Sequence, residues 1–139
     1  MTAAQAPLPY LGTWKMTKCE PLRPDLPHPV SGITVTTQEN DGIHLNSEAT
    51  WSDGRVVKMN LVYQMDGKWY PVTGSPIADS VSVQRLDDRS AEAKLRKGGV
   101  DVGTNRSTVS ADGRTLTAQV EMVGPGGTAI GWTTTSARQ

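Results

Sequence analysis

The chain has 139 residues, and its 14 basic and 14 acidic side chains give a formal net charge of zero. A chain of this length is one domain by the usual size relation, and it can bury a core without disulfide bonds. The balanced charge excludes the positive field that attracts nucleic acid, and no apolar run is long enough to span a membrane as a helix.

The first predicted strand covers residues 10–20 and follows a segment, residues 1–9, that we expect to be disordered. Residues 21–29 come next and contain four prolines. Proline fixes φ and lacks an N–H group, so this segment cannot be a helix interior or a central strand. We predict an extended connector that runs over the surface or across one mouth of the fold.

From residue 31 onward, apolar and polar side chains alternate with a period of two, which predicts strands with one dry and one wet face. Residues 91–96 contain helix-favouring side chains, but their unbroken period of two favours a strand here as well. Tight turns between strands are predicted at four Asp-Gly pairs, because these residues accept positive φ angles. The pairs are residues 41–42, 53–54, 66–67 and 112–113.

These segments make nine or ten short strands in a meander. An open meander would leave two exposed edges, and pairing the first strand with the last removes both. The sequence therefore predicts an all-β fold, a single up-and-down antiparallel β-barrel of about eight to ten strands with no large helix. The predicted barrel domain spans residues 10–135, and residues 136–139 form a C-terminal tail. A barrel of this size has room for a small ligand.

The triplet Gly12-Thr13-Trp14, at the start of the first strand, resembles the opening motif of the calycin superfamily, in lipocalins and fatty-acid-binding proteins alike. This resemblance implies a calycin β-barrel in which Trp14 is a structural residue packed across the closed base. In that family a basic residue near the last strand usually covers the tryptophan, and Arg138 is the candidate here.

A longer run, residues 66–74 followed by 78–81, resembles a group of small bacterial lipocalin-like proteins that are mostly uncharacterised and often exported. The compartment of this chain stays open on sequence grounds. As written it reads as cytoplasmic. Ala4-Gln5-Ala6 resembles the small-residue pattern before a signal-peptidase site, so the protein would be exported if a signal peptide had been removed.

Four uncharged residues are candidates for contacts with a ligand. Trp51 and Trp132 lie on the apolar faces of their strands, as core or as pocket wall. Met59 and Tyr63 share the inward face of one strand. A tyrosine there can donate a hydrogen bond to a ligand or be a satisfied core residue, and a methionine adapts to irregular apolar shapes or fills a gap.

Arg85 and Arg106 are the charged candidates for ligand binding. Each follows two inward positions at a spacing of two, so continued alternation would place both guanidinium groups on the apolar side. A buried guanidinium needs an anionic partner, and a ligand carboxylate could be that partner. The alternatives are that a bulge reverses the facing of a strand, or that Arg85 pairs with Asp87 or Asp88.

No catalytic constellation is present in the sequence. Cys19, the single cysteine, has no adjacent histidine that would activate it, and His28 and His44 are expected to be solvated surface residues. Two histidines cannot make the usual three-ligand zinc site without a carboxylate. We therefore predict no catalytic residue, no metal site and no cofactor.

The sequence thus predicts non-catalytic binding of a small hydrophobic or amphipathic ligand inside the barrel, with a carboxylate on the ligand if the arginines face inward. One alternative is a barrel enzyme of the isomerase or cyclase type, with Tyr63, Arg85 or Arg106 as polar anchors. The other is a protein-interaction module with a filled barrel, whose contact surface would be residues 21–29 or the rim at Trp69-Tyr70. No nucleic-acid or membrane-spanning role is expected, and the chain would be a monomer or a homodimer.

Overall fold

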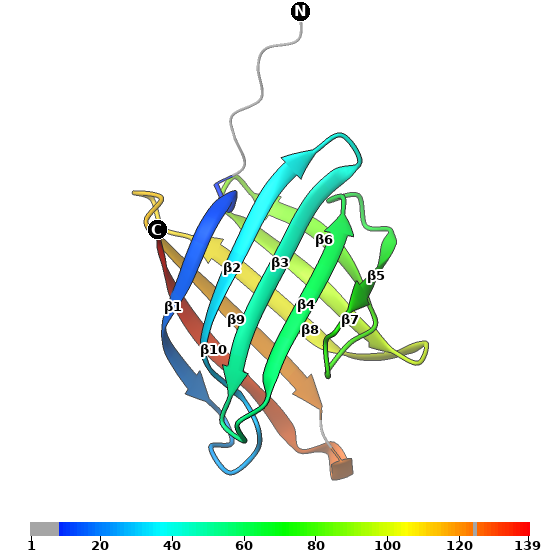
Figure 1. The fold of residues 1–139 in the computed structure, drawn as a ribbon. Coiled ribbons are helices and arrows are strands. Elements are labelled where there is room, and N and C mark those ends of the chain that lie inside the picture. The colour runs from blue at the N-terminus through cyan, green and yellow to red at the C-terminus, as the bar shows by residue number, and fades with distance from the viewer. Residues whose placement is uncertain (1–8, 124) are drawn as a thin grey trace, which may run out of the picture.

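The computed structural model describes residues 9–123 and 125–139, so the predicted disordered segment lies outside the described residues except for Pro9. Ten antiparallel strands form a closed barrel, in which each strand pairs with its neighbours in sequence and β1 pairs with β10 (Figure 1). The elements are β1 (Gly12–Pro21), β2 (Pro29–Glu39), β3 (Gly42–Trp51), β4 (Val56–Tyr63), β5 (Trp69–Thr73), β6 (Ser80–Asp87), β7 (Ser90–Lys97), β8 (Val100–Val109), β9 (Thr115–Val123), the 3-10 turn η1 (Pro125–Gly127) and β10 (Ala129–Arg138).

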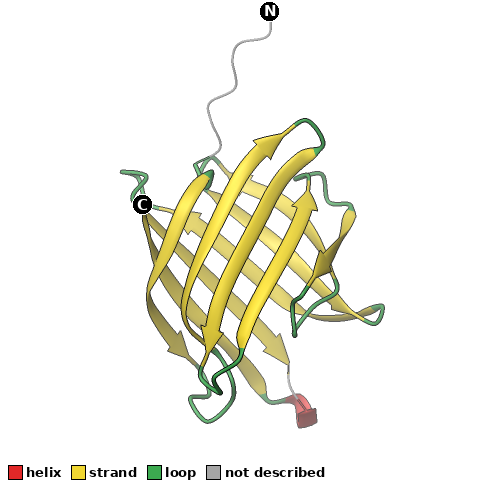
Figure 2. Cartoon of the chain, viewed as in Figure 1, coloured by secondary structure: helices red, strands yellow, loops and turns green. Residues whose placement is uncertain are grey.

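The predicted all-β, up-and-down barrel is confirmed, and Figure 2 shows a barrel built of strands that are joined by loops and turns. Among the described residues, no helix has the length and apolar character needed to cross a membrane. The last strand is longer than expected. Residues 136–138, predicted as part of a tail, belong to β10, and Arg138 pairs with Trp14 on β1. The closing pair of the barrel therefore extends to the end of the chain.

Aspartates organise the hairpin turns of the barrel. The Asp53 carboxylate accepts the backbone N–H of Arg55, and the Asp87 carboxylate accepts that of Arg89. Asp66 and Asp112 accept the N–H two residues further on in the same way. Such a contact replaces a backbone hydrogen bond in a tight turn, which explains why these segments reverse the chain.

The Asp53 and Asp87 carboxyls should make the barrel less stable in acid. The N–H of Arg55 is the main cause that lowers the pKa of Asp53, and the N–H of Arg89 lowers the pKa of Asp87. The folded chain therefore binds fewer protons than the unfolded chain, and this contribution to stability is present above about pH 4, the usual carboxyl range. This contribution is lost as the pH falls through the lowered pKa values that the two carboxyls have in the folded chain.

The measurement is urea unfolding at constant ionic strength across a pH series. We expect a constant midpoint between neutral pH and about pH 5, and a falling midpoint below about pH 4. In the variant Asp87→Asn the fall should be shallower, because one of the titrating carboxyls is gone. A midpoint that rises on acidification below about pH 4 would contradict this account.

One end of the barrel is closed by an aromatic cluster. Trp14 is 1% exposed and Val109 is fully buried, with Tyr10 packed beside them. The Trp14 indole N–H donates to the Tyr10 carbonyl at 2.9 Å, so its polar atom is satisfied. The Arg138 guanidinium stacks over the Trp14 ring at 4.3 Å. The same guanidinium donates to the backbone carbonyls of Pro9, Leu11 and Gly113.

The opposite end of the barrel carries the proline-rich connector. In Figure 1 this connector, between β1 and β2, lies at the same end as the β3–β4 turn and η1. The N–H of Leu22 donates to the Gly131 carbonyl, and the N–H of Ser52 donates to the His28 carbonyl, each within 3 Å. These contacts hold the connector along the edge of this end.

Candidate functional site

The barrel is hollow. Its interior contains a cavity of about 310 Å³ lined by residues from all ten strands. Small side chains leave this space, because positions such as Ala93, Ser107 and Ala118 face inward where larger residues would fill a core. The interaction-module alternative requires a filled barrel, whereas this barrel is hollow.

Most of the cavity wall is apolar. A large part of it comes from β3 to β7, where successive inward positions hold aliphatic side chains. These residues are Leu45, Met59, Leu61, Val72, Val83 and Leu95. Met59 thus lies where the alternation of its strand predicts, and its thioether contributes to the wall.

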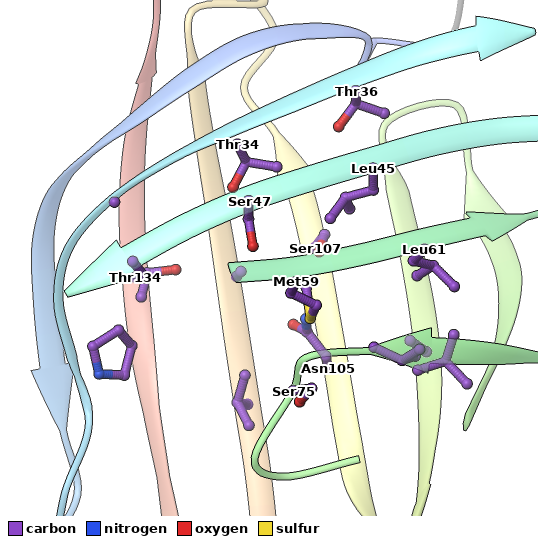
Figure 3. Close-up of a pocket in the computed structure, with 18 of the residues that line it drawn as sticks. Thr34, Thr36, Leu45, Ser47, Met59, Leu61, Ser75, Asn105, Ser107 and Thr134 are labelled. Carbon is purple, nitrogen blue, oxygen red and sulfur yellow. The ribbon is translucent and has the colours of Figure 1, made fainter. Parts of the chain in front are cut away.

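A second part of the lining consists of uncharged polar side chains (Figure 3). Thr34 on β2 pairs with Ser47 on β3, and both line the cavity. Ser107 on β8 and Thr134 on β10 face Ala118, which lies on β9 between them. The interior therefore combines aliphatic walls with hydroxyl groups, an amphipathic lining that the sequence pattern did not reveal.

Asn105 is the least expected member of this lining. It lies on β8 and pairs with Ala93 and Val120, both of which also line the cavity. Its side-chain Oδ1 atom is buried and has no hydrogen-bond partner within the described part of the chain. An unpartnered buried acceptor is uncommon, since leaving one unsatisfied costs about 1–3 kcal/mol.

Two tryptophans line the cavity away from the closed end. The rings of Trp51 and Trp132 meet edge to face, with centroids 5.4 Å apart and planes at 80°. Trp51 pairs with Pro29, where the proline-rich connector enters β2. The Arg55 guanidinium lies 5.2 Å from the centre of the Trp51 ring. Both tryptophans predicted as pocket wall or core are thus brought together on the cavity.

Tyr63, on β4, also lines the cavity and is 6% exposed. Burial raises the pKa of its hydroxyl far above the usual range, so the phenol stays protonated at neutral pH. It is therefore a neutral donor or acceptor and not a general base.

Arg85 does not reach into the cavity, which corrects the expectation that its guanidinium faces the apolar interior. Its strand position is the inner one, because it pairs with the cavity residue Ala91. Arg85 lies near the end of β6, however, and its guanidinium donates to the carbonyls of Asp87 and Asp88 in the following turn. This is the turn-pairing alternative considered for that residue.

Arg106 faces the outside of the barrel, which corrects the second expectation. It is exposed, and its guanidinium pairs with Glu92 at 2.8 Å. A bulge explains the difference, because Gly103 pairs with Leu95 while Asp101 pairs with Arg96, leaving Val102 as an extra residue. The inward positions after the bulge are Asn105 and Ser107.

The residues considered for catalysis or metal binding do not form a centre. Burial, and then the neighbouring Glu20, raise the pKa of the Cys19 thiol, so it is protonated at neutral pH. His44 pairs with Asp41 at 2.6 Å, and His28 contacts the Leu26 carbonyl. Within residues 9–123 and 125–139 there is no group of three or more potential metal ligands.

Fold and cavity together define a hollow, ten-stranded antiparallel β-barrel. Among solved structures, the ileal bile acid-binding protein of zebrafish, crystallised with cholic acid, is similar to it with a TM-score of 0.56. The alignment covers 94% of this chain and 99% of that chain at 12% sequence identity, so the likeness is one of fold. No model of a known protein family matches the sequence, and no curated protein matches it either.

Proposed function

We propose that this protein binds a small hydrophobic or amphipathic molecule inside its barrel without catalysing a reaction. The observation that carries this proposal is the cavity of about 310 Å³, enclosed by ten strands and largely lined by aliphatic and aromatic side chains. Transfer of an apolar molecule from water into such a space is favourable in proportion to the apolar area removed from water.

The comparison with solved structures supports the same proposal. The zebrafish protein was crystallised with cholic acid, a small amphipathic molecule, and its barrel aligns with this one along almost its whole length. Binding without catalysis is favoured because two of the three polar anchors considered for an enzyme, Arg85 and Arg106, turn away from the cavity. Tyr63 is the remaining anchor and is held neutral by burial.

The test is a titration of the purified full chain with the neutral fluorescent dye Nile red, with tryptophan emission recorded in parallel. We expect saturable binding and a change in tryptophan emission, since Trp51 and Trp132 line the cavity. Native mass spectrometry of the same preparation would identify any molecule that co-purifies.

A matched pair of variants locates the binding site. Ala118→Phe places a ring into the cavity and should abolish dye binding, because Ala118 lines the space. Gln119→Phe adds the same ring at the next residue, which is exposed on the outside, and should leave binding unchanged. Equal binding by both variants, or no binding by the wild-type chain, would count against the proposal.

A further inference from the structure

The cavity is electrically neutral. Of the residues that line it in the described chain, only Glu48 carries a charge, and Glu48 is exposed on β3 between the inward residues Ser47 and Ala49. The guanidinium groups of Arg85 and Arg106 are engaged elsewhere, with turn carbonyls and with Glu92. A ligand carboxylate placed inside would lose its hydration without gaining a cationic partner, which is strongly unfavourable.

One polar group in the cavity lining favours a ligand that donates a hydrogen bond. Asn105 Oδ1 is an acceptor, it is buried, and no described residue donates to it. Asn105 lines the cavity, and a rotation of its side-chain amide brings this oxygen within reach of a ligand hydroxyl, which can donate to it. A carboxylate has no proton to donate and would bring a negative charge beside the oxygen. The hydroxyls of Ser107 and Thr134 belong to the same lining and are neutral as well.

We propose that the ligand is an uncharged amphiphile with a hydroxyl head group, an alcohol and not a carboxylic acid, whose O–H donates to Asn105 Oδ1 while its hydrocarbon part lies against the aliphatic wall. This inference rests on the proposed function and names the class of ligand for that cavity. It also replaces the carboxylate-bearing ligand that inward-facing arginines would have required.

The experiment compares three probes built on an unbranched chain of ten carbons, counted with the carboxyl carbon, at neutral pH by displacement of Nile red or by calorimetry. Decanol is neutral and has a donor, methyl decanoate is neutral and has none, and decanoate is charged. We expect decanol to bind about tenfold more tightly than methyl decanoate, because one hydrogen bond to a buried acceptor changes the affinity by about that factor. Decanoate should bind at least about a hundredfold more weakly than decanol.

A variant pair assigns the donor preference to one side chain. In Asn105→Leu, similar in size and without the amide, decanol and methyl decanoate should bind equally, while decanoate should still bind weakly. Asn60→Leu makes the same change at an exposed position on β4 and should keep the wild-type order of the three probes. Circular dichroism establishes that each variant is folded, and the wild-type comparison tests the proposal without either of them.

The outcomes separate this inference from the function on which it rests. If Nile red binds and decanoate binds as tightly as decanol, the inference is overturned while the ligand-binding function stands. An unchanged preference for decanol over its ester in folded Asn105→Leu would equally remove Asn105 from the proposal. If neither the dye nor any of the three probes binds, both proposals fail together.

Discussion

Replacing Trp14 by alanine is expected to lower the free energy of unfolding by about 3–5 kcal/mol, the usual range for a large buried aromatic residue. Trp14 is 1% exposed and belongs to the cluster with Tyr10 and Val109 that closes one end of the barrel. Its removal leaves a cavity, takes the indole donor from the Tyr10 carbonyl and removes the ring beneath Arg138. Urea unfolding monitored by circular dichroism measures the loss.

Trp69→Ala is the matched control for this effect. Trp69 also lies under an arginine, with the Arg96 guanidinium 3.9 Å from the centre of its ring, but it is only half-buried. Its removal loses a cation–π contact and little core, so the expected cost is about 1 kcal/mol. Equal losses for the two variants would show that the closed end is not a principal source of the barrel's stability.

Replacing Gly74 by alanine is expected to cost about 3 kcal/mol, and its effect should reach the cavity wall. Gly74 has φ of +86°, and a Cβ atom there would lie 1.9 Å from the backbone oxygen of Lys58 on β4. The chain after β5 would have to move away from β4. The two strands share only two residue pairs in the described ladder, Asn60 with Thr73 and Leu61 with Val72, so little holds them together.

Gly54→Ala separates the steric part of this cost from the conformational part. Gly54 has nearly the same φ, +88°, but no atom lies within 4 Å of the position its Cβ would take. It should lose only the strain of a left-handed residue, about 1 kcal/mol. We expect the gap between the two variants to appear in urea unfolding, with weaker Nile red binding for Gly74→Ala alone. Similar losses for both would contradict the close approach of Gly74 to β4.

The candidate site was only partly predictable from the sequence. The strands β4 and β8, which both line the cavity, show why. On β4 the alternation is unbroken, so Met59 and Tyr63 line the cavity where the period of two places them. On β8 the extra residue Val102 reverses the facing, which turns Arg106 outward and brings Asn105 inward. Gly103 was the available signal, because only a glycine fits where a Cβ would lie 2.2 Å from the Glu121 oxygen.

Local patterns in the sequence determined which segments are strands and where the chain reverses. Alternation and Asp-Gly pairs involve residues that are close in sequence, so they specify strands and turns independently of the rest of the chain. The resulting meander has two exposed edge strands, and closure into a barrel is the main way to remove them. The tryptophan of the opening motif likewise marks the first strand.

Only the tertiary structure decided what reaches the cavity and what closes the barrel. Arg138 contacts the Leu11 carbonyl across 127 residues of sequence, and no local pattern specifies such a contact. A bulge is set by the pairing of two strands, and the direction of a long side chain such as Arg85 is set by the acceptors that surround its end. The neutral interior with Asn105 is therefore a property of strand register, which the packing of the closed barrel fixes.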